Sequence, residues 1–360
     1  MNDIHGRFRD GLMTQYRLYP RLTVQDVFKY LYQSAFGCEH LVAAEDDAHR
    51  YICEEYARGA PERMPVAEPL CGAYGRVHLH ALTQGLSPKT LAALFCRSAC
   101  HEAEGEARLH EGLAVARSLV VEGLLPFSVE DFDREHAAWR AAGYGAVRHS
   151  EAFREQYCPA YRVVKKDYIR LLPLLMRLDA RPQGARTLLA LEGGSAAGKT
   201  TLARLLGEIY GCTVFHMDDF FLRPEQRTEA RMRECGGNVD RERFLAEVLL
   251  PLSRGECVDY RRFDCRTQTL LPPERIRPSS LCIVEGAYAM HPDLAPLYTL
   301  SVFLDVDPIT QRERVYERNT PSFAERYVKE WIPKETEYFS VMRVKERCDL
   351  VLPISLKEKS

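Results

Sequence analysis

The pattern of hydrophobic positions divides the chain into two parts. Up to about Asp179, apolar residues recur three and four positions apart, as they do on one face of an α-helix. Residues 106–121 follow this pattern. So does the segment Thr23 to Tyr32, which places four residues on one face: Val24, Val27, Phe28 and Leu31. The first part of the chain is therefore predicted to be mainly α-helical.

Two serines in this part have the pattern of helix N-caps. Ser87 is followed by Pro88, and proline suits the first helical position because its φ is already helical and it has no N–H to pair. Ser128 is followed three residues later by Asp131, which would place a carboxylate near the positive end of the helix dipole. We expect helices to begin at both serines.

After the segment Arg181 to Gly184, the pattern changes to short apolar runs separated by helical stretches. Short apolar strands that alternate with helices predict βαβ units and a parallel sheet covered on both faces. Pro182 and Gly184 break regular structure. We therefore predict a helical domain over residues 1–180 and an α/β domain over residues 186–360. The five predicted strands are Thr187–Glu192, Thr213–Met217, Leu281–Val284, Leu300–Leu304 and Asp349–Leu352.

Composition narrows the class of protein. A chain of 360 residues, 46% hydrophobic and 28% charged, is typical of soluble globular proteins with two domains. A net charge of −2 gives no support for nucleic-acid or membrane-surface binding, and no apolar run approaches the roughly 18 residues of a membrane span. Met1 to Asp10 lacks the apolar region of a secretory signal. Together with twelve scattered cysteines, this predicts a cytoplasmic protein with reduced thiols, and leaves homo-oligomer formation open.

One glycine-rich segment matches the phosphate-binding pattern G-x-x-x-x-G-K-[ST]. It lies between a predicted strand and a predicted helix, which is the context that the pattern requires. Small residues allow backbone N–H groups to surround phosphate oxygens, and the helix adds the positive end of its dipole. Lys199 would reach the β- and γ-phosphates, and Thr200 would ligate Mg²⁺. The alternative is a glycine-rich turn without a nucleotide. The predicted nucleotide site comprises Gly193, Gly194, Ser195, Ala196, Ala197, Gly198, Lys199, Thr200 and Thr201.

Two carboxylates follow other predicted strands. Glu285 ends the strand at 281–284, so it would face the same edge of the sheet as the phosphate loop and hold Mg²⁺ or its water shell. Asp218 follows the strand at 213–217 and could accept the proton of an attacking hydroxyl. The neighbouring aromatic residues, including Phe220, are expected to wall an acceptor pocket. For Glu285 the alternative is an ordinary carboxylate at a strand end.

These motifs together resemble those of the uridine kinase, nicotinamide riboside kinase and phosphoribulokinase group. The resemblance covers about Thr187 to Pro353 and rests on residues 193–201, 216–222, the strand ending at Glu285 and the arginine-rich segment after Asp307. It implies a P-loop NTPase fold that uses ATP and Mg²⁺ to phosphorylate a hydroxyl on a small molecule, with Asp218 as the catalytic base. The string Met-Asp-Asp-Phe-Phe is most similar to the nicotinamide riboside kinase and uridine kinase-like branch.

The resemblance also implies an acceptor side. Asp240 matches an acid that hydrogen-bonds substrate hydroxyls, and Tyr260, Arg262 and Asp264 lie in the segment that closes over the acceptor. That segment departs from the Tyr-Asp-Phe-x-x-His pattern of uridine kinases, so pyrimidine recognition is not implied. Two adjacent arginines, Arg261 and Arg262, would suit an acceptor that carries a phosphate or carboxylate. The alternative is a solvated surface pair.

Arg314 and Arg318 complete the predicted catalytic set with Lys199 and Asp218. They are four residues apart, so they share one face of a helix. In the family such residues form a lid that closes over ATP and neutralises charge on the transferred phosphoryl group. An ordinary charged helix is the alternative.

The N-terminal part resembles only uncharacterised bacterial proteins, so the resemblance supplies no activity. A structural or oligomerising role is one interpretation. A second small-molecule site is another, built from Glu39, His40, Arg76, His78, His149, Tyr161 and Arg162. A bound metal is the third, although the candidate ligands lack the paired C-x-x-C spacing of zinc sites and buried thiols explain them equally well. These are Cys38, His40, His49, Cys53, Cys71, His78, His80, Cys96, Cys100 and His101.

Three functions therefore stand at this point. The leading hypothesis is a small-molecule kinase with an appended helical domain that recognises a substrate or a regulator. The second is a bifunctional enzyme with another activity in the N-terminal half. The third is a nucleotide-gated binding module without kinase turnover.

Overall fold

A computed structural model describes residues 4–38, 44–59, 64–99, 104–182 and 184–354. Contacts divide the chain into two compact units, Met1–Ala180 and Arg181–Lys357. The division falls at the segment in which Pro182 and Gly184 interrupt regular structure; Gln183 of that segment lies outside the described residues.

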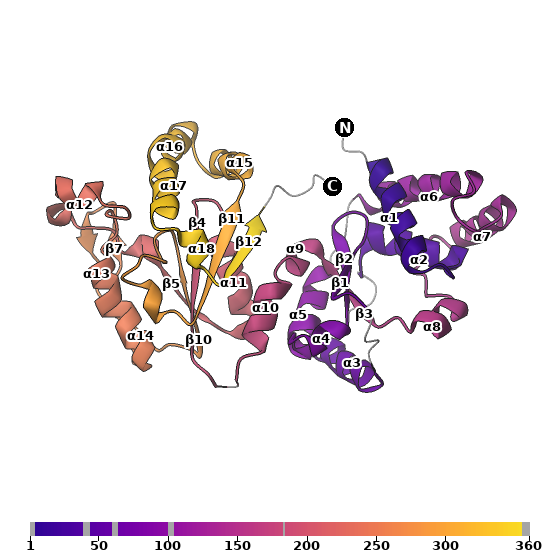
Figure 1. The fold of residues 1–360 in the computed structure, drawn as a ribbon, viewed down its shortest axis with the longest axis horizontal. Coiled ribbons are helices and arrows are strands. Elements are labelled where there is room, and N and C mark those ends of the chain that lie inside the picture. Colours follow the sequence, from indigo (N-terminus) through magenta and orange to yellow (C-terminus); the bar gives the residue numbers. More distant parts are fainter. Residues whose placement is uncertain (1–3, 39–43, 60–63, 100–103, 183, 355–360) are drawn as a thin grey trace. The chain divides into compact units, whose positions relative to one another are not determined.

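The N-terminal unit is mainly helical, as predicted (Figure 1). Ser87 and Ser128 act as N-caps: each side-chain oxygen accepts a backbone N–H three residues on, from Thr90 and Asp131, at 3.0 Å. The helices of this unit are α1 (Ile4–Leu18), α2 (Val24–Phe36), α3 (Glu45–Ala57), α4 (His80–Thr83), α5 (Pro88–Ser98), α6 (Gly105–Val121), α7 (Val129–Ala141), α8 (Glu151–Tyr157), α9 (Lys166–Ile169) and α10 (Leu172–Asp179).

A small antiparallel sheet in this unit was not predicted. Its strands are β1 (Ala67–Pro69), β2 (Tyr74–His78) and β3 (Tyr161–Lys165), with β2 in the middle. All five residues of β2 are buried, including Arg76 and His78, so the strand has no alternation of polar and apolar positions that the sequence could display. Helix α5 packs against β3, and α2 contacts β2. The sheet therefore carries charged side chains into the interior of the unit.

The C-terminal unit is built on five parallel strands in the order β12-β11-β4-β10-β5. All five predicted strands are present, and the α/β prediction is confirmed. Helix α11 (Lys199–Tyr210) packs against β4, β5 and β10. The strands are β4 (Thr187–Gly193), β5 (Thr213–His216), β10 (Leu281–Glu285), β11 (Leu300–Val306) and β12 (Leu350–Ile354).

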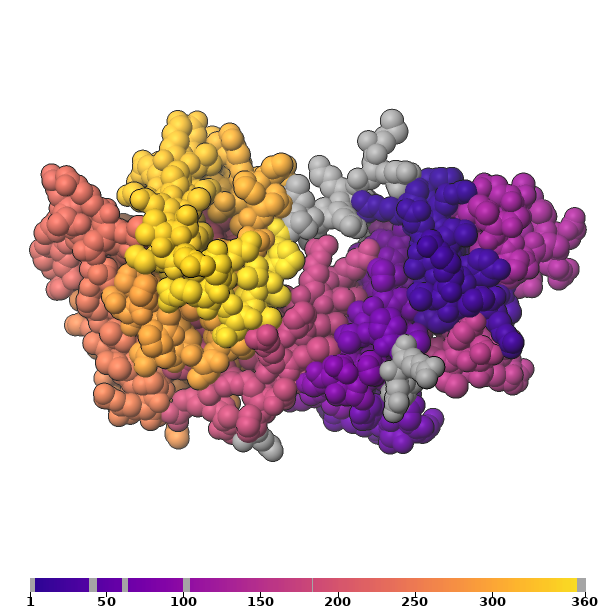
Figure 2. Space-filling model, in the orientation of Figure 1, coloured from indigo at the N-terminus to yellow at the C-terminus, as the bar shows by residue number. Residues whose placement is uncertain are grey.

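The remaining elements lie between these strands in sequence. Helices α15 to α17 gather at the end of the sheet where β4 and β11 finish (Figure 1). In the space-filling view their orange to yellow surface is continuous (Figure 2). The helices are α12 (Glu229–Arg233), α13 (Arg241–Phe244), α14 (Leu250–Arg254), α15 (Pro308–Arg318), α16 (Pro321–Arg326), α17 (Ile332–Val341) and α18 (Val344–Arg347), with π-helical turns at Leu245–Leu249 and Tyr327–Trp331. Two short antiparallel pairs join β6 (Val258–Tyr260) to β9 (Glu274–Ile276) and β7 (Phe263–Asp264) to β8 (Thr269–Leu270).

The main core of this unit lies beside β4, β5 and β10. Its fully buried members include Phe215, Phe220, Phe244, Val284 and Tyr338. Among the described residues, no helix is both long and apolar enough to cross a membrane.

Candidate active site

The glycine-rich loop between β4 and α11 has a backbone shape that depends on glycine. Gly193 has a φ of 143°, and a Cβ atom there would lie 2.7 Å from the carbonyl oxygen of Leu304. Gly198, directly before α11, has a φ of 99°. L-residues with side chains rarely adopt such angles, so these two positions fix the loop as it leads from the strand into the helix.

Lys199 lies at the start of α11 and folds back over the loop. Its ammonium donates hydrogen bonds to the carbonyl oxygens of Gly193, at 2.8 Å, and Gly194, at 2.9 Å. The helix N-terminus adds the positive end of its dipole to this charge. The loop is therefore an electropositive cradle suited to a polyphosphate.

Glu285, at the end of β10, joins two neighbouring elements. Its Oε1 accepts a hydrogen bond from the Thr200 hydroxyl at 3.0 Å and lies 2.7 Å from Nδ1 of His216. This hydrogen bond raises the pKa of His216. Burial alone would raise the pKa of Glu285, but the hydrogen bond from His216 and the charge of Lys199 outweigh burial and lower it. Glu285 is therefore an ionised carboxylate at the edge of the phosphate loop.

Asp218 lies on the 3₁₀ turn Met217–Asp219 after β5. Its side chain is accessible from the cleft, and no described residue hydrogen-bonds to it. Reduced hydration within the cleft raises its pKa; Glu285 and Asp219 act in the same direction, and Lys199 opposes them. The adjacent Asp219 differs because its Oδ2 accepts the Tyr260 hydroxyl at 2.7 Å. Of the two carboxylates, Asp218 is the one available to a ligand.

A cleft of about 370 Å³ brings these residues together. Three of the residues predicted to bind the nucleotide, Gly193, Gly194 and Ala197, do not line the cleft. The residues that line it are Ser195, Ala196, Gly198, Lys199, Thr200, Thr201, Asp218, Glu285, Ala287, Arg318, Asn319, Tyr327 and Glu335. The cleft combines a phosphate loop with three carboxylates, those of Asp218, Glu285 and Glu335, and an arginine. A phosphate loop, carboxylates and an arginine are groups that phosphoryl transfer uses.

Residues 188–311 match the phosphoribulokinase / uridine kinase family. The C-terminal unit is similar to these kinases. Among curated proteins, the chain is 24% identical over 193 residues to uridine kinase-like protein 3 of Arabidopsis thaliana, covering 49% of this chain and 41% of that protein. It is 25% identical over 124 residues to phosphoribulokinase of Synechocystis, covering 33% and 37%. The chain thus spans less than half the length of the curated relatives it matches.

Solved structures include similar kinases. A possible uridine kinase from Bacillus stearothermophilus is 21% identical, with a TM-score of 0.41; the match covers 52% of this chain and 99% of that one. Shikimate kinase from Acinetobacter baumannii is 20% identical, with a TM-score of 0.28, over 46% of this chain and 82% of that one.

In this kinase-like unit the two predicted lid arginines differ in position. Arg318, at the end of α15, lines the cleft. Arg314 lies one turn earlier and is partly buried, and its Nη1 donates to the carbonyl oxygen of Ala196 at 3.4 Å. Arg318 therefore faces the cleft, whereas Arg314 lies against the phosphate loop.

Two aromatic residues predicted on the acceptor side belong to the core instead. Phe220 is 0% exposed and packs edge-on against Phe244 at a centroid distance of 4.9 Å. Tyr260 is also buried, and its hydroxyl is engaged with Asp219. Phe220 does not line the cleft at the phosphate loop, because burial of a large aromatic side chain in the core is strongly favourable. That Phe220 walls an acceptor pocket stays a prediction.

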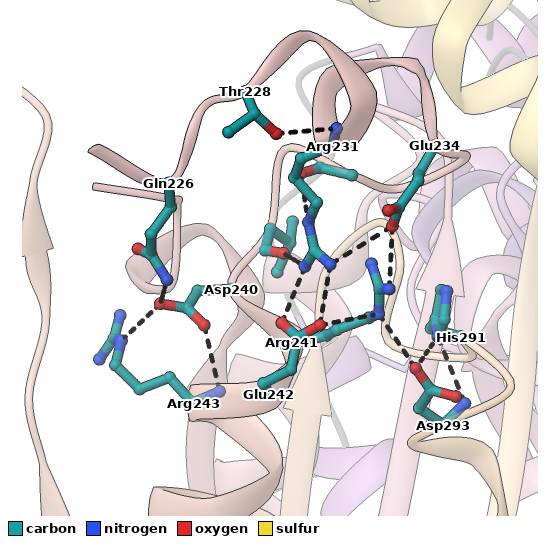
Figure 3. Close-up of polar contacts among 12 residues, drawn as sticks. Gln226, Thr228, Arg231, Glu234, Asp240, Arg241, Glu242, Arg243, His291 and Asp293 are labelled. Carbon is teal, nitrogen blue, oxygen red and sulfur yellow. Dashed lines mark hydrogen bonds and ion pairs between the residues drawn. The ribbon is translucent and has the colours of Figure 1, made fainter. Parts of the chain in front are cut away.

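Asp240 is only 2% exposed and serves as the N-cap of α13 (Figure 3). One carboxylate oxygen accepts the backbone N–H of Arg243 at 3.2 Å, and the other accepts Nε2 of Gln226 at 3.0 Å. Both oxygens are therefore engaged within the protein. Because Asp240 is buried, a substrate hydroxyl could reach it, as the resemblance implies, only if the surrounding residues moved.

A network of arginines anchors the segment before Asp240 (Figure 3). Arg231 forms a two-point ion pair with Glu242, at 2.8 Å for each nitrogen–oxygen pair, and also donates to the carbonyl oxygen of Val239 at 2.9 Å. Arg241 bridges Glu234 at 2.9 Å and Asp293 at 3.0 Å. These contacts fix the segment 226–243 against the loop that follows β10.

The other two predicted acceptor residues lie in or beside the β7–β8 hairpin. Arg262 is exposed. Asp264 caps the turn by accepting the backbone N–H of Arg266 at 2.7 Å. Neither residue lines the cleft.

Two buried glutamates at the phosphate loop had escaped sequence reasoning. Glu335 of α17 accepts both the backbone N–H and the hydroxyl of Ser195, at 2.8 and 2.6 Å. Glu192, at the end of β4, accepts the backbone N–H groups of Gly193 and Met290, at 2.8 and 2.9 Å. Burial raises the pKa of both, that of Glu192 to about 7. Glu192 directly precedes the phosphate motif, so the sequence could have indicated that it lies at the site. Glu335 is far from the motif in sequence, so nothing in the sequence indicated its position.

The described residues contain no cluster of three or more histidine, cysteine, aspartate or glutamate side chains arranged to hold a metal. The described candidates from the N-terminal half therefore do not converge on a metal site. His40, Cys100 and His101, and Glu39 of the second predicted site, lie outside the described residues.

Proposed function

We propose that the C-terminal unit transfers the γ-phosphoryl group of ATP to a hydroxyl on a small molecule. The observation that carries this proposal is that Lys199, Thr200, Asp218, Glu285 and Arg318 line one cleft at the phosphate loop. A GTPase or a nucleotide switch has no need of an unengaged carboxylate that faces the phosphate loop across a cleft.

In this proposal the loop holds the triphosphate by its backbone N–H groups. Lys199 leaves the carbonyl oxygens of Gly193 and Gly194 to contact the β- and γ-phosphates. Arg318 from the cleft wall, supported by Arg314 on the loop, offsets the charge that develops on the transferred group. Positioned positive charge of this kind is the main catalytic contribution in phosphoryl transfer.

The side-chain oxygens of Thr200 and Glu285 are suitable ligands for Mg²⁺. A hydroxyl and an ionised carboxylate lie 3.0 Å apart, and Mg²⁺ in nucleotide sites uses one or two protein oxygens together with phosphate oxygens and water. When bound, the ion would neutralise phosphate charge. His216 holds the carboxylate in place from the side of β5.

Asp218 would accept the proton of the attacking hydroxyl. Its raised pKa makes it a stronger base than an ordinary aspartate, and a base must lie within hydrogen-bond reach of the hydroxyl as transfer occurs. For the acceptor itself we propose contacts from the Tyr260–Asp264 segment, in which Arg262 is exposed. Asp240 and Tyr260 are buried and would contact the acceptor only if the residues around them moved. Phe220 would support the pocket from the core.

The test is an ADP-release screen of the full chain against nucleosides, sugars, phosphorylated sugars and vitamin precursors, with Mg²⁺ present. We expect at least one acceptor to stimulate ADP release, and Asp218→Asn to reduce that rate by about 10²–10⁴-fold. Asp259→Asn is the matched control, because Asp259 is exposed on β6 and does not line the cleft. An Asp218→Asn protein with normal turnover would refute the role of the base.

Two other outcomes would favour the competing functions. Tight ATP binding with no transfer to any acceptor would support a nucleotide-gated module. An activity that needs no ATP and survives Asp218→Asn would support a second catalytic function in the N-terminal half. We propose a cytoplasmic location on the sequence features above; sedimentation of the purified chain would establish its oligomeric state.

A further inference from the structure

A second cavity lies in the N-terminal unit. Its volume is about 430 Å³, within the range of small-molecule sites. Side chains from α2, α3, α5 and β3 form its walls. Much of that wall is apolar, supplied by residues such as Ala48, Phe95, Pro159 and Val163, with the ring of Tyr51 at the exposed side. A cavity of this size and lining suits a compact organic molecule.

Lys29 of α2 is one of the residues that line this cavity. The residue is largely buried, and its Nζ donates to the carbonyl oxygen of Val147 at 3.0 Å. An ammonium has three donors, and in the described part of the chain this is its only hydrogen bond. No carboxylate of the described residues lies within ion-pair distance of it. A partly buried charge in this state is costly unless something pairs with it.

The neighbouring charges are already paired with one another. Arg76 on β2 is fully buried and contacts Glu68 at 2.7 Å. Asp26, one turn before Lys29 on α2, accepts hydrogen bonds from the Ser150 hydroxyl at 2.7 Å and the Thr23 backbone N–H at 3.0 Å. Neither group can turn to Lys29 without leaving another buried group without its partner.

The floor of the cavity is a fixed hydrogen-bonded chain. His149 lies between Asp26 and Tyr161, at 2.8 Å from the carboxylate and 2.7 Å from the phenolic oxygen. The guanidinium of Arg76 packs on the Tyr161 ring at 4.8 Å. Burial lowers the pKa of His149 to about 4, so the imidazole is neutral at physiological pH. This wall brings no further charge to the cavity.

Arg162 adds a second cation from β3. Its Nη1 donates to Glu55 at 2.8 Å, and its guanidinium lies 5.9 Å from the centre of the Phe95 ring. A guanidinium has five donors in a fixed fork, so donors remain after the Glu55 contact. Lys29 and Arg162 thus both line the cavity. Asp47 of α3 also belongs to the lining, and its carboxylate is paired with Arg50 at 2.8 Å.

We propose that this cavity binds a small organic anion whose carboxylate or phosphate group pairs with Lys29 while its apolar body lies against Phe95. The proposal is independent of the kinase function of the C-terminal unit. The anion supplies the negative charge that pairs with Lys29, and Arg162 orients the anion by further hydrogen bonds.

The structural alternative is that Lys29 only tethers the segment around Val147. A neutral donor such as glutamine would make that contact without the cost of a partly buried charge. The alternative also leaves unexplained why a lysine, rather than a neutral residue, lines the cavity.

The test uses the full chain and two anionic probes, benzoate and phenyl phosphate, with benzyl alcohol as the neutral control. Binding would be followed by ligand-observed NMR, and protection of the Lys29 amine from an amine-reactive reagent by mass spectrometry. We expect at least one anion to bind and protect Lys29, and benzyl alcohol to bind at least tenfold more weakly. Whichever anion binds more tightly distinguishes a carboxylate site from a phosphate site.

Lys29→Gln keeps a donor for Val147 and removes the charge, so it should weaken anion binding at least tenfold. Lys89→Gln is the matched control, because Lys89 is exposed on α5 and outside the cavity. Equal binding of anion and alcohol, or unchanged anion binding in a folded Lys29→Gln protein, would overturn the proposal. If that variant does not fold, absence of Lys29 protection in the unaltered chain would overturn it equally.

Discussion

Lys199 and Lys29 face two different cavities, and they were visible in the sequence to different degrees. Lys199 belongs to a run of consecutive residues, because one loop and the start of one helix build the phosphate cradle. Lys29 is surrounded by α2, β3 and the segment around Val147, which are far apart in sequence. A site made by one continuous segment leaves a motif; a site assembled from distant segments leaves only isolated residues.

Two buried glutamates, one in each unit, have pKa values shifted in opposite directions. Glu68 in the N-terminal unit is paired with Arg76 and lies 3.3 Å from His78. Burial would raise its pKa, but the charge of Arg76 and these hydrogen bonds hold the pKa well below the usual range. Glu192 in the C-terminal unit has only neutral hydrogen-bond donors, so burial prevails and raises its pKa to about 7. Burial alone therefore does not decide the charge of a carboxylate; its partners do.

The largest expected effect comes from removing the charge at the phosphate loop. Lys199→Met should lower turnover with the best acceptor by about 10³-fold, as is typical when one electrostatic stabiliser of the transition state is lost. Initial-rate measurements at saturating ATP would check this. Lys89→Met should retain normal rates, and a Lys199→Met enzyme within tenfold of normal would mean that the cleft does not perform phosphoryl transfer.

A smaller effect is expected at the proposed Mg²⁺ ligand. Glu285→Gln should raise the Mg²⁺ concentration needed for half-maximal activity by about 10–100-fold, the usual cost of disturbing a metal site. Glu208→Gln, on the exposed face of α11, is the control. An unchanged Mg²⁺ titration would exclude Glu285 from the metal site.

The contrast between the buried groups predicts opposite pH responses of the two units. Because its pKa is raised, Glu192 adds to the free energy of unfolding of the C-terminal unit. This contribution is complete below about pH 4.5 and is lost as the pH rises through about 7. Because its pKa is lowered, His149 adds to the free energy of unfolding of the N-terminal unit above about pH 6.5. This contribution is lost as the pH falls toward 4. From pH 5 to 8 the free energy of unfolding of the C-terminal unit should therefore fall by about 2 kcal/mol, whereas that of the N-terminal unit should not fall.

The chain carries two tryptophans, one in each unit, so these responses can be measured separately. Trp139→Phe leaves Trp331 to report urea unfolding of the C-terminal unit, and Trp331→Phe leaves Trp139 for the N-terminal unit. Glu192→Gln should flatten the pH dependence seen by Trp331. If both tryptophans report the same pH dependence, the assigned difference between the units is wrong.

The smallest effect is expected at Glu335. Its carboxylate accepts hydrogen bonds from the backbone N–H and the hydroxyl of Ser195. Its negative charge would repel an incoming phosphate. Glu335→Gln should therefore tighten ATP binding about three- to tenfold, measured by calorimetry, since one unfavourable charge interaction is worth about 1 kcal/mol near a protein surface. Glu337→Gln is a control on the same helix. Weaker binding in Glu335→Gln would show that the carboxylate instead holds the loop in its binding shape.

Much of the C-terminal fold could be predicted from the sequence. A buried parallel strand is a short apolar run, and all five runs became strands. Boundaries moved by a residue or two; β5, for example, ends at His216 because Met217 begins a 3₁₀ turn. The small sheet of the N-terminal unit could not be predicted, because Arg76 and His78 are buried by ion pairing and hydrogen bonds rather than by apolar character.

The site was predicted in part for similar reasons. Motifs placed Asp218 and Glu285 at strand ends, and both line the cleft. They did not reveal which way a side chain points, so Phe220 was expected in a pocket and lies in the core. Glu335 is separated from Ser195 by 140 positions, and nothing in its local sequence distinguishes it from a surface glutamate.

The strand order of the C-terminal unit has a consequence for its synthesis. β4 is the central strand and the first of the five in sequence, whereas its neighbour β11 is paired on the far side with β12, the last of the five in sequence. The phosphate loop is therefore made early, but the sheet that supports it stays incomplete until residues 350–354 emerge. Among the described residues of the N-terminal unit, the last strand ends at Lys165. During translation the N-terminal unit can therefore complete its sheet while the kinase-like unit still exposes the edges of unpaired strands, which are prone to aggregation.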